Sequence, residues 1–448
     1  MIIKNRQELA TTELRKRALD IIEAGITRVL PSVIMKSAVS YDSAHRVLTV
    51  SDATYRLRGR LFVVGGGKAT ALMAETLESI IPPDHITDGV VTGNCKRSDY
   101  KTSQIKIVEA THPVPDQGGL DGVARMLALR DQYAIGKDDL IIGLFSGGAS
   151  ALMPCPVEGV SLADKQRITE LLLGCSADIH EINAVRKHLS KTKGGGLGHF
   201  YAPATVVSLV LSDVVGNDLD VVSSGPTFPD SSTFADACQV LEKYDLIERA
   251  PKSVVEYLQK GCRGEVAETP KVLLNCRNHL IGDNTLALAA MADKAGEMGL
   301  APHVVTAEQK GDTVAVANLR AAEIINGSYT GYDVVLIGGE TTSLLPDNAG
   351  RGGRNQHYAA VSMLAMEKYP GEWAVASVGT DGSDFLPDVA GAIVDNNSLA
   401  KARAEGIAVK SYLDRYDSHT LLKKIGGSLI VTGNTGTNVG DVIVYILD

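Results

Sequence analysis

The sequence of 448 residues is poor in aromatic side chains and contains no long apolar run. Aromatic residues make up 5% of the chain, which disfavours a surface on which nucleic-acid bases stack. No hydrophobic run approaches the roughly 18 residues of a membrane-spanning helix. Basic residues are outnumbered, because 44 Lys and Arg face 53 Asp and Glu and give a formal net charge of -9. This acidic balance argues against nucleic acid or an anionic membrane as a partner.

The cysteine spacing and the first residues give an expectation for the cellular compartment of the protein. The six cysteines include no CxxC pair and no spacing typical of a zinc site, so reduced thiols are expected. Residues 1–22 are charged throughout and lack the apolar core of a signal peptide. We therefore expect a cytoplasmic protein, and the sequence leaves open whether it is a monomer or a homodimer.

Glycine is abundant, with 45 residues, and glycines or small polar residues follow most of the short apolar runs. Apolar runs that alternate with helical stretches indicate strands of parallel sheets covered on both faces. The expected strands are residues 60–64, 140–145, 205–211, 271–275, 333–337, 373–378 and 441–447. The expected helices include residues 69–80, 181–193, 284–298 and 358–367.

This alternation predicts an α/β protein with two domains, each a mainly parallel sheet flanked by helices. A turn-rich segment between residues 226 and 270 is the expected boundary, which gives domains of residues 1–240 and 265–448. Ligands of open parallel sheets bind beyond the carboxyl ends of the strands, where the glycine-rich loops of this sequence are expected. Such loops and helix N-termini favour phosphate, so the pattern suggests nucleotide chemistry on a small substrate.

Two common nucleotide fingerprints are incomplete at the first glycine-rich loop. Lys68 follows three glycines, but Ala69 stands where a P-loop has Ser or Thr. Thr70 replaces the third glycine of a dinucleotide motif, and residues 92–94 lack the acid that holds a ribose. A lysine at a strand–loop–helix junction opposes the helix dipole unless an anion occupies the loop. We therefore interpret Lys68 as an anion contact, and a surface lysine after a tight turn is the alternative.

Three further segments could bind ligands, and each has a structural alternative. Residues 146–150, Ser-Gly-Gly-Ala-Ser, form either an anion-binding loop or a simple helix start. Residues 181–193 indicate a basic amphipathic helix, with a face for a ligand or for solvent. That face contains Asn183, Arg186, Lys187, Ser190 and Lys193. Asp213 and Asp381 follow strands, where they could hold Mg²⁺ against phosphates or merely form Asx turns.

Residues 350–356, Gly-Arg-Gly-Gly-Arg-Asn-Gln, are the strongest single signal. Guanidinium groups bind phosphate or carboxylate oxygens in pairs, and a positioned arginine raises phosphoryl-transfer rates by about 10³ to 10⁵. The alternative is a structural turn with exposed arginines. The segment therefore favours a kinase-like chemistry.

Together these strings resemble the glycerate 2-kinase family, whose C-terminal part is known as the MOFRL domain. The resemblance extends in order over nearly the whole chain. The matching stretches are GGGKAT (65–70), THPVPDQGG (111–119), LFSGGASALM (144–153), NAVRKHLSKTKGG (183–195), LSDVVGNDLDVVSSGPT (211–227), GGETTS (338–343), GRGGRNQ (350–356), GTDGSD (379–384), DVAGAIVD (388–395) and TGNTGTNVGD (432–441). Two positions depart from the family pattern, which usually has Glu at His357 and often a basic residue at Gly196.

The resemblance implies a Rossmann-like N-terminal domain and a C-terminal α/β domain with the MOFRL region at about residues 330–445. It places the active site in the cleft between the domains. It implies ATP- and Mg²⁺-dependent phosphorylation of D-glycerate to 2-phosphoglycerate, with Lys68 and Arg354 as catalytic residues. Family members often carry the name hydroxypyruvate reductase from gene context, so an NAD(P)H-dependent reductase stays the alternative. A kinase for a related sugar acid and a non-catalytic sugar-acid sensor also stay open.

The remaining candidate residues divide by ligand. The residues expected to bind the substrate are Ser146, Gly147, Gly148, Ser150, Arg186 and Lys187. The residues expected to bind ATP are Asp213, Asn217, Gly338, Gly339, Glu340, Thr341 and Asp381. Asp213 is also the expected ligand of the metal.

Overall fold

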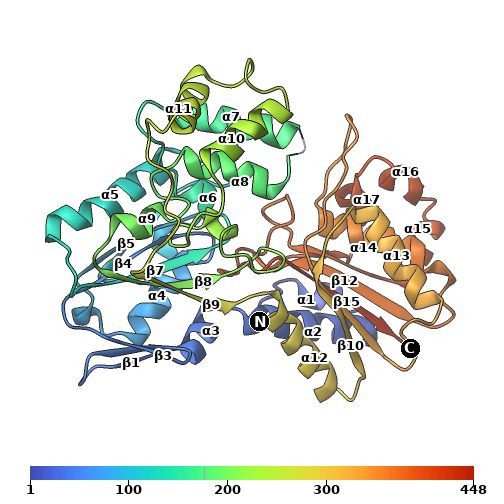
Figure 1. The fold of residues 1–448 in the computed structure, drawn as a ribbon. Coiled ribbons are helices and arrows are strands. Elements are labelled where there is room, and N and C mark those ends of the chain that lie inside the picture. The colour runs from blue at the N-terminus through green and yellow to red at the C-terminus, as the bar shows by residue number, and fades with distance from the viewer. Residues whose placement is uncertain (176) are drawn as a thin grey trace. The chain divides into compact units, whose positions relative to one another are not determined.

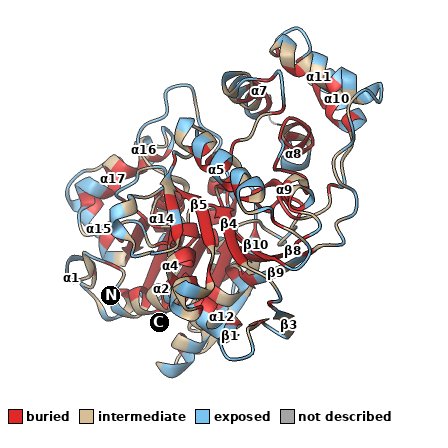
Figure 2. Ribbon diagram, turned by 90° about the vertical axis from the view of Figure 1, so that its left-hand side faces the viewer, coloured by how far each residue is buried: buried red, intermediate tan, exposed pale blue. Residues whose placement is uncertain are grey.

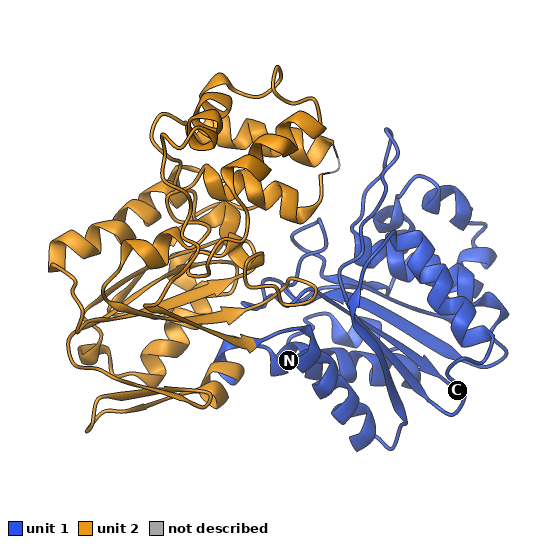
Figure 3. Cartoon of the chain, in the orientation of Figure 1, with its two compact units in different colours: residues 1–33, 282–448 blue, residues 34–281 orange. Residues whose placement is uncertain are grey.

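The computed structural model describes residues 1–175 and 177–448, which form two compact units (Figure 3). Residues 34–281 make up one, here named the Rossmann unit. Residues 1–33 and 282–448 make up the other, here named the mixed-sheet unit. The compact units thus divide the chain at other residues than the predicted domain boundaries, because residues 1–33 pack with the C-terminal part.

A six-stranded sheet forms the centre of the Rossmann unit (Figure 1). Its order is β6-β5-β4-β7-β8-β9, and the pairs from β6 to β8 are parallel. This is the strand order of a doubly wound Rossmann sheet, so the Rossmann-like prediction is confirmed. The strands are β4 (Leu61–Gly66), β5 (Asp88–Gly93), β6 (Ile105–Glu109), β7 (Leu140–Ser146), β8 (Thr205–Leu211) and β9 (Cys276–Gly282).

Helices cover both faces of this sheet, which explains why its central strands are apolar at nearly every position. Strands β4, β5 and β7 are buried throughout, as the red ribbons of β4 and β5 in Figure 2 show. All helices described in the Rossmann unit are α3 (Pro31–Ala38), α4 (Thr70–Ile80), η1 (Pro83–His85), η2 (Arg97–Asp99), α5 (Gln117–Tyr133), α6 (Ala149–Leu152), α7 (Leu162–Gly174), α8 (Ile179–His188), α9 (Gly196–Phe200), η3 (Val222–Ser224), α10 (Phe234–Lys243) and α11 (Lys252–Cys262). A small antiparallel sheet contains β1 (Val39–Asp42), β2 (Val47–Val50) and β3 (Ala53–Arg56).

Two predicted elements of this unit differ from the structure. The strand expected at residues 271–275 lies instead at Cys276–Gly282, because Val272 and Leu274 face solvent, with 69% and 83% of their surface exposed. The helix expected at residues 181–193 ends at His188. Beyond it the backbone N–H of Lys191 donates to the carbonyl of Cys155 at 2.9 Å. Apolar or basic periodicity does not report such non-local backbone pairing.

The mixed-sheet unit contains a second six-stranded sheet, in the order β10-β11-β15-β12-β13-β14. Strands β10 and β11 are parallel, whereas each later pair is antiparallel. The prediction of a mainly parallel sheet in the C-terminal domain was therefore wrong. Buried central strands are apolar on both faces whatever their direction, so the pattern did not reveal that β15 returns antiparallel. The strands are β10 (Pro302–Gln309), β11 (Val334–Gly339), β12 (Trp373–Gly379), β13 (Gly391–Asp395), β14 (Leu429–Ile430) and β15 (Asp441–Leu447).

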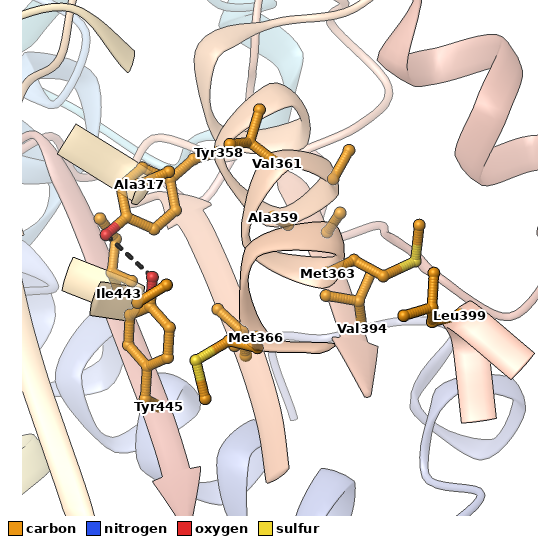
Figure 4. Packing of buried hydrophobic residues seen from close by; sticks show 14 of the residues in the cluster. Ala317, Tyr358, Ala359, Val361, Met363, Met366, Val394, Leu399, Ile443 and Tyr445 are labelled. Atoms are coloured by element: carbon orange, nitrogen blue, oxygen red, sulfur yellow. Dashed lines mark hydrogen bonds between the residues drawn. The ribbon is translucent and has the colours of Figure 1, made fainter. Parts of the chain in front are cut away.

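Helices α2 and α12 lie on one face of this sheet, and α13 and α14 lie on the other (Figure 1). The helices are α1 (Arg6–Leu9), α2 (Glu13–Arg28), α12 (Asn284–Glu297), α13 (Thr313–Ile325), α14 (Arg354–Ala365), η4 (Met366–Lys368), α15 (Asn396–Ala404), α16 (Val409–Leu413) and α17 (Ser418–Ile425). Buried side chains of α14 pack on the sheet, and Tyr445 of β15 donates a hydrogen bond to the Tyr358 hydroxyl at 3.1 Å (Figure 4). Among the helices described, none has the length and apolar character needed to cross a bilayer.

Candidate active site

The strand order of the Rossmann sheet reverses between β4 and β7, and ligands of such sheets bind beyond the carboxyl ends of the strands at this point. Strand β4 ends at Gly66 and is followed by Lys68, while β7 ends at Ser146. The backbone N–H of Lys68 donates to the carbonyl of Gly147 at 2.9 Å. The backbone N–H of Ala69 donates to the Ser146 hydroxyl at 3.0 Å. The structure therefore brings together two loops that the sequence singled out separately.

Glycines allow these two loops to approach closely. Gly67 has φ +146°, and a Cβ there would lie 2.1 Å from the Ser146 Oγ. Gly148 has φ +84°, and a Cβ there would lie 3.1 Å from both Lys68 Cγ and His112 Cδ2. Both positions therefore require glycine, for conformation and for space. The half-buried Lys68 side chain runs past Gly148 beside His112.

A chain of hydroxyl groups extends from the loop at residues 146–150. The Ser150 Oγ lies 2.7 Å from the Ser224 Oγ, which donates to the Asn183 side-chain oxygen at 3.0 Å. The Ser223 hydroxyl donates to the Ser146 carbonyl at 3.1 Å. Ser223 and Ser224 have φ values of +57° and +59°, a strained conformation for residues with a Cβ. The pair could not be predicted from the sequence, because backbone strain is not visible in the string SSGPT.

Lys187, predicted to bind substrate, is only 2% exposed and is engaged with two acids. Its amine forms an ion pair with Asp220 and a second with Asp230 Oδ1 at 3.1 Å. Its neighbour Arg186 is half-buried, and no acid in residues 1–175 or 177–448 forms an ion pair with it. The two adjacent basic residues of α8 thus have different environments.

We expect Lys187→Met to destabilise the protein by about 3–5 kcal/mol, because it leaves two buried carboxylates without their cation. Urea unfolding followed by circular dichroism measures the change. Lys191→Met is the matched control, because Lys191 is exposed in the segment after the same helix. Equal free energies of unfolding for Lys187→Met and the wild type would contradict the assignment.

Asp213 and Asn217 follow β8 at the same edge of the sheet. Asp213 is half-buried, and Asn217 has φ +56°. The described residues contain no group of three or more His, Cys, Asp or Glu that could enclose a metal ion. Mg²⁺ does not need such a cage, since it keeps several waters and binds one or two carboxylates together with substrate phosphates. Asp213, a single carboxylate after the end of β8, is compatible with this mode of Mg²⁺ binding.

The mixed-sheet unit gathers a second set of polar residues where β11 and β12 end. Because β15 runs antiparallel, its first residue Asp441 pairs with both Gly339 and Gly379. Arg354, the first residue of α14, binds Asp441 with two hydrogen bonds, from Nε at 2.6 Å and from Nη2 at 3.0 Å. Its Nη1 donates to Glu340 Oε1 at 2.6 Å. Two acids therefore fix the guanidinium and raise the pKa of Arg354.

Helix α14 starts four residues earlier than the sequence predicted, because Asp384 caps it. The carboxylate of Asp384 accepts from the backbone N–H groups of Asn355 at 2.9 Å and Gln356 at 2.8 Å. The Asn355 side chain donates to Asp441 Oδ1 at 2.9 Å. Asp384 and Asp441 were not predicted as site residues, although both lie in glycine-rich motifs that carry the family resemblance.

We expect stability to fall as the pH rises through the titration range of Asp384. Burial raises the pKa of this carboxyl from 3.8 to about 6, although hydrogen bonds from residues 355 and 356 oppose the shift. The folded state then binds a proton that the unfolded state has released, so stability decreases between about pH 4 and 6. The shift corresponds to about 3 kcal/mol at most. Unfolding free energies at several pH values measure it against Asp384→Asn. An identical pH slope in that variant would contradict the assignment.

The other predicted ATP residues lie in the same unit as Arg354. Gly338 and Gly339 end β11, and the Thr341 hydroxyl accepts from Thr313 at 3.0 Å. Asp381 is half-buried and accepts from the backbone N–H of Ser383 at 2.9 Å, which is an Asx turn. The predicted ATP residues are therefore divided between the units, because Asp213 and Asn217 belong to the Rossmann unit.

The fold and the loops define an α/β protein with a doubly wound sheet whose switch point suits anions. Family models match Domain of unknown function (DUF4147) at residues 17–259 and the MOFRL family at residues 333–441. The chain belongs to the glycerate 2-kinase family, in which these two matches occur together, as the motif resemblance predicted.

Relatives match over nearly the full chain. A glycerate 2-kinase of Pyrococcus horikoshii is 37% identical over 445 residues, which cover 96% of this chain and 98% of the relative. A protein of Agrobacterium vitis that carries a hydroxypyruvate reductase name is 38% identical over 397 residues, covering 86% of this chain and 98% of the relative. The crystal structure of a glycerate kinase from Thermotoga maritima is 36% identical, with a TM-score of 0.81 and coverage of 97% and 99%.

Proposed function

We propose that the protein transfers the γ-phosphoryl group of ATP to D-glycerate and forms 2-phosphoglycerate. The kinase names of full-length relatives support the reaction class. The observation that carries the proposal is the approach of the Lys68 loop to the loop at residues 146–150, at the switch point of the sheet. This arrangement offers backbone N–H groups and a lysine to anionic ligands.

Phosphoryl transfer passes through a loose transition state, in which positioning and positive charge matter more than covalent help. Lys68 and Arg354 supply that charge to the migrating phosphoryl group. Glu340 and Asp441 support Arg354, because they hold its guanidinium in one orientation. Hydrogen-bonding groups of the guanidinium that face neither acid bind the phosphoryl oxygens.

The carboxylate of glycerate binds at the loop of residues 146–150, with Arg186 nearby. Lys187 stays paired with Asp220 and Asp230, so its role is to stabilise the position of α8 and not to contact the substrate. Asp213 or Asp381 accepts the proton of the attacking hydroxyl group. Asp213 would hold the Mg²⁺ that accompanies ATP, and this ion would neutralise phosphate charge.

Asn217, Gly338, Gly339, Glu340 and Thr341 are the residues that we propose to bind ATP. Their backbone and hydroxyl donors suit phosphate or ribose oxygens. A hydroxypyruvate reductase is the second candidate, because the strand order is that of dinucleotide-binding sheets. Residues 92–94, where β5 ends, lack the acidic residue that holds a ribose, which favours the kinase.

One assay separates these activities. The purified protein is expected to release ADP only when ATP, Mg²⁺ and D-glycerate are all present, as a coupled enzyme system measures. Oxidation of NADH or NADPH with hydroxypyruvate, without ADP release, would replace the kinase with the reductase. Binding of D-glycerate without either turnover would make the protein a sensor. Faster turnover of another sugar acid would identify that acid, and not D-glycerate, as the preferred phosphoryl acceptor.

The position of the new phosphate is a separate expectation. We expect phosphorus NMR to show a phosphate whose coupling is to the single proton of carbon 2. Coupling to the two protons of carbon 3 would identify 3-phosphoglycerate and overturn the regiochemistry while leaving the kinase class intact.

A further inference from the structure

Three basic side chains of the Rossmann unit lie near enough for their charges to interact, and none of them forms an ion pair with an acid among the described residues. Lys165 belongs to α7, Arg186 to α8, and Lys193 to the segment between α8 and α9. Lys165 and Lys193 are 7% and 3% exposed. Throughout the described ranges, no Asp or Glu forms an ion pair with any of the three, and the Lys165 amine is buried without a hydrogen-bond partner. We call these three residues the cation cluster.

The neighbouring Lys187 shows that this fold supplies acids where a buried cation serves structure alone. Its amine has both Asp220 and Asp230. Burial of an unpaired charge is far more expensive than burial of a paired one. Burial and the neighbouring charge of Arg186 accordingly lower the pKa of Lys165 to about 7. The pKa of Lys193 is lowered as well, by burial and by the charges of Lys165 and Arg186, so the three groups are mutual neighbours.

The nearest ionisable group of opposite sign does not balance the cluster. The Cys155 thiol interacts with both lysines, but burial raises its pKa, so it stays neutral near pH 7. The cluster is therefore suited to bind an anionic ligand. Arg186 is its half-buried member and connects it with the surface.

Side-chain hydrogen bonds connect the Asn183 side of α8 with the loop at residues 146–150. Asn183 lies one turn before Arg186 on α8, so their side chains share a face. Asn183 accepts from Ser224, whose hydroxyl lies 2.7 Å from that of Ser150. The cluster thus borders the loop to which we assign the acceptor.

We propose that Lys165, Arg186 and Lys193 form the subsite that binds the carboxylate of the sugar-acid acceptor, beside the loop at residues 146–150. This inference rests on the proposed function, and it adds Lys165, which comes from another helix than the basic face predicted at residues 181–193. A carboxylate accepts several charge-assisted hydrogen bonds, which matches three cationic donors that form no ion pair with an acid among the described residues. Binding raises the pKa of Lys165 again, so the protein takes up a proton near pH 7.

Calorimetric titration with D-glycerate tests the subsite without turnover. The titration is run with Mg²⁺ and a non-hydrolysable ATP analogue on the wild type, Lys165→Met, Arg186→Met and the exposed control Lys191→Met. We expect Lys165→Met and Arg186→Met to bind D-glycerate about 10- to 100-fold more weakly, and Lys191→Met to bind it normally. Uncharged glycerol should not bind to the wild type. Buffers of different ionisation enthalpy should reveal proton uptake with the wild type and none with Lys165→Met.

Each other outcome decides against the inference or against the function. Normal D-glycerate binding by Lys165→Met and Arg186→Met overturns the subsite. If these two variants bind the ATP analogue more weakly but D-glycerate normally, the cluster binds phosphate, which also overturns the subsite. If Lys165→Met does not fold, Arg186→Met decides. Cluster-dependent binding by a wild type that phosphorylates nothing keeps the subsite and overturns the kinase. Normal turnover with unaffected binding in both variants keeps the kinase and overturns the subsite.

Discussion

Lys68→Met is expected to lower kcat by about 10³-fold while the protein stays folded. In the proposed mechanism the lysine supplies positive charge to the transferring phosphoryl group, and a positioned electrostatic donor contributes about 10²- to 10³-fold or more to such reactions. Methionine keeps the length and the apolar stem of the side chain, so packing beside Gly148 is retained. The coupled ADP assay at saturating D-glycerate and ATP measures the effect.

Lys96→Met is the matched control, because Lys96 is an exposed lysine after the neighbouring strand β5. It should retain wild-type turnover and stability. Turnover of Lys68→Met within a few-fold of the wild type would remove Lys68 from the catalytic role.

Arg354→Ala is expected to lower kcat by about 10³- to 10⁵-fold, the range for an arginine that stabilises phosphoryl transfer. The same change leaves Asp441, which is 4% exposed, without its two hydrogen bonds from the guanidinium. A loss of stability is therefore expected together with the loss of rate. Arg354→Lys separates the two effects, because a lysine keeps the charge near Asp441 but lacks the planar pair of donors.

We expect Arg354→Lys to retain most of the stability and still lose kcat by orders of magnitude. Arg351→Ala is the control within the same glycine-rich string, since Arg351 is exposed. Arg354→Lys with near-normal kcat would show that charge alone matters there. Arg354→Ala with near-normal kcat would exclude the arginine from catalysis.

The sequence predicted the Rossmann sheet well, because buried parallel strands and the glycines after them are local signals. Lys68 and the loop at residues 146–150 follow two such strands, and their approach follows from strand order. The direction of β15 could not be predicted, since a run such as residues 441–447 is apolar on both faces in either direction. That antiparallel return brings Asp441 to Arg354, so the acids that hold the arginine were missed.

The basic helix shows a second limit of the sequence. Lys187 and Arg186 are adjacent, and periodicity placed both on one basic face, which was open to a ligand or to solvent. Only the fold reveals that Asp220 and Asp230, more than 30 residues further along the chain, neutralise Lys187. Lys165 comes from another helix, so no spacing rule connects it with Arg186. Pairing of charges between distant segments is a tertiary property.

The proposed mechanism requires Lys68 and Arg354 to stabilise the same migrating phosphoryl group. A double-mutant cycle of kcat with Lys68→Met, Arg354→Lys and the combined variant tests it most directly. Groups that act on one transition state are strongly non-additive, so the combined loss in activation free energy should be well below the sum of the single losses. Losses that add fully would contradict the claim, because the two residues would then serve independent steps.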